Sequence, residues 1–169
     1  MSKDSFEMLQ NFIIQLSEIN AFIQYLGVLL IGSIPFIEAF FAAALGAVVG
    51  IPPIPAALSS MIGNWISIML VILPFSALLM KIRNRKSKKE GGFIQNRAKK
   101  TKEMYDKYGV PGLAILTPLV ASGHIAAFTS LAAGADKKRV IFWHSLSIVI
   151  WGVIGVGIGY FVGFEYIVR

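Results

Sequence analysis

The scarcity of charge constrains this chain more than any other feature of its sequence. Residues 20–80 carry one formal charge, Glu38, and residues 110–135 and 140–164 carry none. A helix needs about 20 mostly apolar residues to cross the hydrocarbon core of a bilayer, and each of these stretches is longer. The pattern therefore predicts an all-α integral membrane protein and argues against a water-soluble domain or a disordered chain.

The positive charges support the same interpretation. The formal net charge of +7 would by itself fit a nucleic-acid-binding protein. However, ten of the sixteen Lys and Arg residues lie within residues 81–102, beside an apolar stretch, and three more lie at residues 137–139. Cytoplasmic loops that flank membrane segments show this bias. We therefore expect membrane lipid and no nucleic acid among the partners, with a lipid-headgroup patch as the alternative for the basic residues.

Residues 1–19 are expected to form an amphipathic helix at the membrane surface. Four apolar side chains fall on one helical face: Phe6, Leu9, Ile13 and Leu16. Alternatively, this helix continues to Ile31 and spans the bilayer. Residues 20–80 form the first membrane half, with a re-entrant segment at about 34–55 and a span at 56–80. The fourteen residues 36–49 would cover about 21 Å as a helix, short of the roughly 30 Å core.

The second membrane half follows a basic cytoplasmic loop at residues 81–109. Residues 110–135 are expected to form a re-entrant hairpin rather than a span, because both flanks are basic and a hairpin keeps both inside. Residues 140–164 then cross the membrane. A face of glycines would allow close helix contact: Gly152, Gly155, Gly157 and Gly159. In the cytoplasmic membrane, the N-terminus and the basic loop are expected on the inner, cytoplasmic side and the C-terminus on the outer side.

The two halves share a spacing. Twelve positions separate Glu38 from Gly50, and twelve separate Ser122 from Gly134. Each stretch precedes an apolar span that contains tryptophan. Interrupted segments in corresponding positions of two inverted halves are typical of transporter sites near the bilayer midplane. Chance similarity in a chain rich in Ala and Gly is the alternative.

Glu38 is the strongest candidate for a functional group. An ionisable side chain at membrane depth costs about 2.5–3.5 kcal/mol on insertion scales and is usually functional. We therefore assign Glu38 to proton or cation coupling, with a structural role as the alternative. Six residues at the expected helix breaks are candidates for the substrate path: Pro52, Pro53, Pro118, Ser122, Gly123 and His124. Simple kinks are the alternative for these breaks.

Other polar residues in the apolar stretches give weaker signals. Asn64 is either a polar group of the cavity or a helix–helix contact. His124 and His144 could relay protons, but no further ligand stands near either one at metal-binding spacing. The sequence has no phosphate-binding loop, dinucleotide fingerprint, nucleophile elbow or zinc pattern. We therefore expect no catalytic residue, no metal and no cofactor, and hence no enzyme.

Residues 30–163 resemble a known family. The first motif of the small multi-drug export protein family is similar to Glu38, Gly46, Gly50 and Pro52-Pro53, and its second resembles residues 108–113 and 117–123. The second half is also similar to the DedA (VTT-domain) superfamily. The resemblance implies a DedA-like fold with two oppositely oriented re-entrant hairpins and a membrane-embedded acid. It also implies a link to lipid translocation or to proton-coupled drug resistance.

This sequence departs from the family pattern at two positions near the acid. Phe40 and Ala44 stand where the family usually has an arginine and a proline. The leading hypothesis is a proton-linked secondary transporter or flippase that moves an amphiphilic or lipid-linked substrate across the cytoplasmic membrane. The alternatives are a proton-coupled small multidrug exporter and a non-transporting scaffold that binds anionic lipid or a protein partner. A homodimer stays open, because 169 residues leave little shielding for broken backbone.

Overall fold

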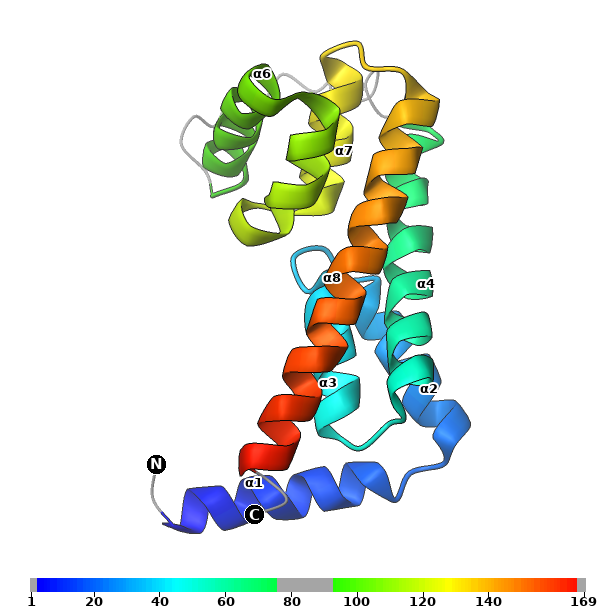
Figure 1. Ribbon diagram of the computed structural model, residues 1–169, viewed down its shortest axis with the longest axis vertical. Helices are drawn as coiled ribbons and strands as arrows, with labels where there is room; N and C mark the ends of the chain where they lie inside the picture. Colours follow the sequence, from blue (N-terminus) through cyan, green and yellow to red (C-terminus); the bar gives the residue numbers. More distant parts are fainter. Residues whose placement is uncertain (1–2, 76–92, 167–169) are drawn as a thin grey trace. The chain divides into compact units, whose positions relative to one another are not determined.

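The computed structural model describes residues 3–75 and 93–166, and the secondary structure in these ranges is helical (Figure 1). The helices are α1 (Lys3–Ser17), α2 (Ala21–Gly32), α3 (Glu38–Val48), α4 (Pro53–Ile72), α6 (Phe93–Val120), α7 (Gly123–Ala132) and α8 (Lys137–Tyr166). The prediction of an all-helical chain is therefore confirmed for the described residues.

Two compact units make up the chain, and each is described by itself. Unit 1 comprises Met1–Asn64 and Ile148–Arg169, and unit 2 comprises Trp65–Ser147. Helices α4 and α8 each begin in one unit and end in the other. Unit 1 thus contains α1 to α3 with the start of α4 and the end of α8, and unit 2 contains α6 and α7 with the remaining parts.

Among the described residues, two helices are long and apolar enough to cross a membrane, Pro53–Ile72 of α4 and Lys137–Gly163 of α8, and a bent pair formed by Gln10–Ser17 and Ala21–Gly32 would make a third. The mean hydropathies of α4 and α8 are 1.6 and 2.0, and only 33% of each apolar window is buried inside the protein. Leu70 of α4 and Phe161 of α8 are both 67% exposed. Apolar helices with this much uncovered surface are typical of proteins whose solvent is lipid.

The bounds of these helices differ from the expected spans. Helix α4 begins at Pro53 rather than at residue 56, since proline is tolerated at the first helical position, where its missing N–H is not needed. It ends at Ile72, just before Pro74, because the residue before a proline avoids helical backbone. Residues 76–80 of the expected span and 81–92 of the basic loop lie outside the described residues. Residues 93–108 of that loop are helical.

Helices α1 and α2 meet at a sharp elbow. Residues Gln10–Ser17 and Ala21–Gly32 are inclined by 115°, so the alternative of one continuous helix from the N-terminus to Ile31 is wrong. The side-chain oxygen of Asn20 accepts a hydrogen bond from the Phe22 N–H at 2.9 Å and begins α2. The amide of Gln24 donates to the carbonyl oxygens of Leu16 and Ser17, which end α1. These two side chains satisfy backbone groups that the break would leave exposed.

Helices α2 and α3 form an antiparallel hairpin in unit 1, and Figure 1 shows the chain reversing direction between them. The buried face of α3 is built from alanine and glycine: Ala39, Ala42, Ala43, Gly46 and Ala47. Small side chains of this kind let neighbouring backbones approach closely. At 1.5 Å per residue, the eleven residues of α3 cover only about 16 Å, so this helix is too short to cross a bilayer alone.

A glycine stripe on α8 packs against α3. A methyl group at Gly155 would collide with the carbonyl oxygen of Phe40, and one at Gly159 would collide with that of Ala44. Both partner positions lie one helical turn apart on α3, as the two glycines do on α8. The prediction that Gly157 belongs to this face is wrong, because a methyl group there would meet nothing within 4 Å. The helical period of 3.6 places residue 157 on the opposite side from 155 and 159.

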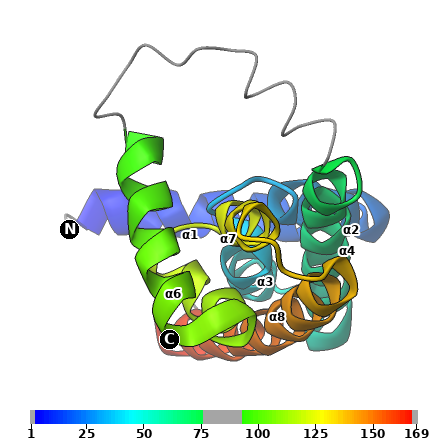
Figure 2. The same cartoon turned by 90° about the horizontal axis from the view of Figure 1, so that it is seen from above.

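Unit 2 contains a second hairpin. Helix α6 bends at Gly109, whose φ of 64° lies in the left-handed region, so residues 93–108 and 110–120 are separate helical segments (Figure 2). The segment 110–120 and α7 are joined by a turn at residues 121–122. Val110, Leu113 and Ala114 of this hairpin are buried with Ala126, Ala127 and Leu131.

Candidate functional site

The two short helices α3 and α7 end in the same way. Gly50 and Gly134 follow them with φ of 86° and 90°, values that glycine adopts without strain. The N–H of Ile51 donates to the carbonyl of Gly46 at 3.0 Å, and the N–H of Ala135 donates to that of Ser130 at 3.0 Å. Each helix therefore has the six-to-one bond of a Schellman cap. The shared twelve-residue spacing thus corresponds to shared backbone structure.

The same register also matches burial in the two halves. Ala42 and Ala43 of α3 correspond to Ala126 and Ala127 of α7, and all four have 0% exposure. The shared spacing therefore extends to the caps and to two buried alanines in each helix.

Glu38 is the first residue of α3 and is 5% exposed. Its φ of 55° and the φ of 75° at Phe36 lie in the left-handed region, which costs a non-glycine residue about 1–2 kcal/mol. Backbone strain of this kind concentrates at functional sites. This arrangement holds a carboxyl group away from water at the turn of the hairpin.

Ser122, Gly123 and His124 come together at the turn of the second hairpin. Ser122 is fully buried, and its hydroxyl accepts a hydrogen bond from the His124 N–H at 3.2 Å, which caps α7. The His124 ring places Nδ1 3.2 Å from the Ser122 hydroxyl oxygen and Nε2 2.8 Å from that of Ser67 on α4. Ser67 could not be identified as a site residue from the sequence, because 57 residues separate it from its partner.

The remaining predicted site residues lie at a helix boundary or within a helix. Pro52 precedes α4 and Pro53 begins it, so both lie at the real break between α3 and α4. Pro118 does not break the second hairpin, because α6 continues through it to Val120. Asn64 is 3% exposed on α4 and belongs to unit 1. In the described part of the chain, no three His, Cys, Asp or Glu side chains gather as metal ligands.

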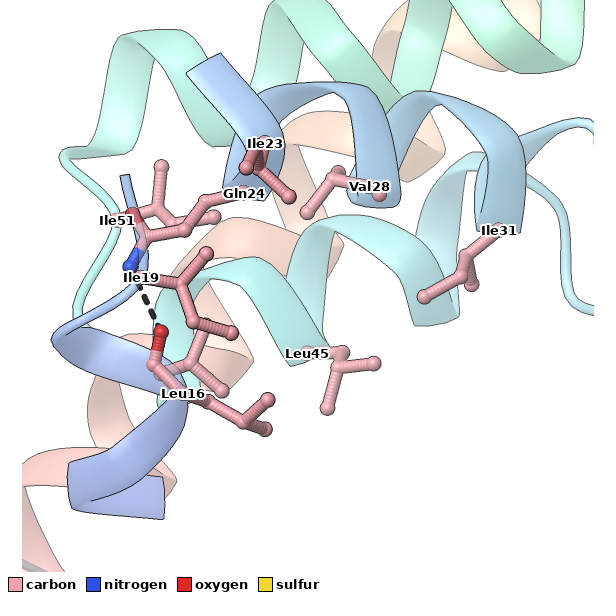
Figure 3. Close-up of a pocket in the computed structure, with 10 residues that line it drawn as sticks. Leu16, Ile19, Ile23, Gln24, Val28, Ile31, Leu45 and Ile51 are labelled. Atoms are coloured by element: carbon pink, nitrogen blue, oxygen red, sulfur yellow. Dashed lines mark hydrogen bonds between the residues drawn. The ribbon is translucent and has the colours of Figure 1, made fainter. Parts of the chain in front are cut away.

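An apolar cavity of about 230 Å³ lies beneath the elbow of unit 1 (Figure 3). Its lining is apolar apart from one amide side chain and comprises Leu16, Ile19, Ile23, Gln24, Gly27, Val28, Ile31, Leu45, Val49 and Ile51. The Gln24 amide is engaged with backbone carbonyls, so it adds little polarity to the cavity. The sequence did not predict this cavity, because the elbow that creates it interrupts an apolar pattern which continues on both sides.

The cavity and Glu38 lie at opposite ends of α3. The cavity is lined by Leu45 and Val49 near the end of the helix, whereas Glu38 begins it. Leu45 lies seven positions after Glu38, which corresponds to about 10 Å along the helix axis. Unit 1 therefore offers an apolar binding volume and a buried carboxyl group as two separate features of one hairpin.

Apolar helices of membrane length define this chain as a membrane protein. The family model described as "Putative small multi-drug export protein" matches residues 38–154, which is more than half of the chain, and the chain belongs to this family. The match begins at Glu38 and leaves out α1 and α2, which form most of the cavity wall. No curated protein and no solved structure matched the chain.

Proposed function

We propose that this protein is a proton-linked secondary exporter or flippase that moves an amphiphilic or lipid-linked substrate across the cytoplasmic membrane. The observation that carries this proposal is the buried carboxyl group of Glu38 at the turn of a hairpin too short to span the bilayer. Membership of a small multi-drug export family agrees with export. No catalytic step, metal or cofactor is part of the proposal.

In this proposal the α2–α3 hairpin is re-entrant. Helix α1 would lie in the membrane interface, because its inclination of 115° to α2 is the geometry of a surface helix that leads into an inserted one. The turn that contains Glu38 would then lie inside the bilayer. Non-helical backbone at that depth needs cover from protein or a water-filled cavity. The close contact of α8 with α3 supports the first of these conditions.

The substrate class follows from the two features of unit 1. The apolar cavity suits a hydrocarbon chain or ring system, since its only polar side chain is already hydrogen-bonded. The carboxyl group suits a proton or the cationic part of a substrate. A small multidrug exporter of lipophilic cations is the second candidate, and the buried acid favours it. For the DedA-like arrangement we propose opposed hairpins, and because α4 and α8 are then the two crossings, both termini lie on one side of the membrane and the basic loop lies on the other.

A scaffold that binds anionic lipid is a third candidate, favoured by exposed cations in unit 2. Among the described residues these are Lys100, Lys102, Lys107, Lys137, Lys138 and Arg139. About 1 kcal/mol of attraction per basic residue is typical near an anionic membrane surface. A transporter can also bind anionic lipid in this way. Lipid binding therefore favours the scaffold over a transporter only if transport is absent. A second copy of the chain is the partner we propose for covering the remaining lipid-facing surfaces.

Transport in proteoliposomes tests the proposal. The purified chain would be reconstituted with either a lipophilic cationic dye or a fluorescent phospholipid, and movement would be followed with and without a pH gradient. Gradient-dependent movement of one probe supports export and identifies its class. Glu38→Gln should abolish it, whereas Glu7→Gln, an exposed acid of α1, should not. Failure of both probes with folded wild-type protein would leave the scaffold candidate.

A further inference from the structure

The imidazole ring of His124 has a serine hydroxyl at each of its two nitrogens. Nε2 lies 2.8 Å from the Ser67 oxygen and Nδ1 lies 3.2 Å from the Ser122 oxygen. Ser67 belongs to α4, whereas Ser122 and His124 belong to the turn that begins α7. The ring thus connects a membrane-length helix to the turn of the second hairpin, and all three residues lie in unit 2.

Two hydroxyl neighbours allow this ring to change protonation state without losing a hydrogen bond. A neutral imidazole donates from one nitrogen and accepts at the other, and a protonated one donates from both. A serine hydroxyl can donate or accept by rotating about its C–O bond. When a proton binds Nε2, the Ser67 hydroxyl turns from donor to acceptor, and release of the proton reverses the turn. Neither nitrogen becomes an unsatisfied buried group in either state.

His144 provides the contrast within the same unit. Its Nδ1 lies 2.9 Å from the carbonyl oxygen of Val140, one turn earlier on α8. A carbonyl oxygen only accepts, so this bond fixes the hydrogen on Nδ1. The contact therefore holds His144 in one tautomer, whereas the hydroxyls around His124 leave either tautomer open.

The surroundings of His124 are poor in charge. Residues 65–72 of α4, residues 110–120 of α6 and the rest of α7 contain no formal charge. Helix α8 contributes residues 137–139 and His144 to unit 2, and α6 carries its charged side chains before the bend at Gly109. When the ring gains a proton in such surroundings, the local electrostatic potential changes strongly, because few charged side chains lie near enough to offset the new charge.

We infer that His124, held between Ser67 and Ser122, is a proton-carrying station of the second hairpin, separate from Glu38. Imidazole is the side chain that gains and loses protons nearest neutral pH, which suits it to this role. The Ser67 hydroxyl accepts from Nε2–H when the proton is bound and donates to Nε2 when it has left. Protonation reverses the donor and acceptor of the hydrogen bond between Ser67 of α4 and His124 of α7. It therefore affects the conformation of the hairpin turn in addition to carrying charge. This inference rests on the proposed proton-linked transport.

Nuclear magnetic resonance of histidine rings tests the inference directly. The chain has two histidines, so ¹⁵N-histidine-labelled protein in lipid nanodiscs gives two separable sets of ring signals. The ¹⁵N signals of both His124 ring nitrogens should change on acidification across the neutral pH range, and Ser67→Ala should alter the response at Nε2. The ring of His144 should keep one tautomer and serves as the internal control. A His124 ring that stays unchanged over this range would overturn the inference.

Transport measurements separate this inference from the proposed function. In proteoliposomes with a lipophilic cationic dye, His124→Gln should lower gradient-driven movement by about fivefold or more and flatten its pH profile. His144→Gln should keep the wild-type profile, and Ser67→Thr, which retains the hydroxyl, should retain more activity than Ser67→Ala. Wild-type transport with an unchanged profile in His124→Gln rejects the histidine station alone. Wild-type protein that moves no probe under a gradient rejects the proposed function itself.

Discussion

Ser147 donates its hydroxyl hydrogen to the carbonyl oxygen of Ala114, 2.7 Å away, and this is the carbonyl whose usual helical donor is replaced by Pro118. A proline has no N–H, so the carbonyl four residues earlier loses its partner. Both groups are buried in unit 2. The hydroxyl from α8 therefore compensates for a proline in the hairpin, which explains how α6 continues through residue 118.

We expect Ser147→Ala to destabilise the protein by about 0.6 kcal/mol and at most about 1.7 kcal/mol, the range of interhelical hydrogen bonds in membranes. The cost should shrink in the background of Pro118→Ala, because alanine restores the N–H that Ala114 lacks. Thermal or denaturant unfolding in detergent of both single variants and the double variant gives the coupling energy. Equal costs in the two backgrounds would show that Ser147 does not act through this carbonyl.

The close approach of α8 to α3 predicts that replacing a glycine of α8 by alanine destabilises the protein at some positions and not at others. Gly155→Ala and Gly159→Ala should each destabilise unit 1 by about 1–3 kcal/mol, because a methyl group would meet a backbone carbonyl of α3 that cannot move alone. Gly157→Ala is the matched control on the same helix and should be neutral or slightly stabilising. The unfolding midpoints of the three variants in detergent check this, and a loss at Gly157 similar to the others would contradict it.

The matching caps of α3 and α7 predict that the same substitution costs a similar amount of stability in both helices. Gly50→Ala and Gly134→Ala should each cost about 1–2 kcal/mol, although nothing lies within 4 Å of the added methyl group at either position. The cost comes from the left-handed backbone alone. Asparagine tolerates this conformation better, so Gly50→Asn and Gly134→Asn should cost less than the alanine variants. Alanine variants as stable as the wild type would show that the caps relax without strain.

The cavity beneath the elbow can be partly filled by a larger side chain at one glycine of its lining. Gly27 lines the cavity, and an added side chain would meet nothing within 4 Å, so Gly27→Leu should fold while occupying part of the volume. Binding of a fluorescent amphiphile by the detergent-solubilised protein should weaken by about tenfold, which corresponds to 1.4 kcal/mol. Gly157→Leu adds the same side chain in open space outside the cavity and should leave binding unchanged. Equal binding by all three proteins would exclude the cavity as the binding site.

Much of the helical organisation could be predicted from charge and from breaking residues. The bend at Gly109 and the turns near Pro35 and Ser122 coincide with glycine, proline or serine, which disfavour helix continuation. The elbow after residue 19 coincides with the polar residues Ser17, Glu18 and Asn20, but its angle of 115° could not be predicted from them. Its inclination depends on tertiary contacts such as those of Gln24.

The candidate site was only partly accessible from sequence. Glu38 stands out because it is the single charge in a long apolar stretch, and burial at a hairpin turn agrees with that expectation. Its left-handed backbone could not be predicted, because glutamate has no preference for that conformation. The Ser67 partner of His124 was also inaccessible, since serine in an apolar helix has many other roles and the contact is distant in sequence.

The division of the chain has a consequence for biogenesis. Residues from Ile148 onward belong to the same unit as the first three helices, although they are synthesised last. At about 5–20 residues per second, the α2–α3 hairpin must wait several seconds before the glycine stripe of α8 reaches it. During this interval the alanine face of α3 lacks its final cover. A prematurely terminated chain would retain that exposed surface permanently, which would make it a substrate for membrane quality-control proteases and chaperones.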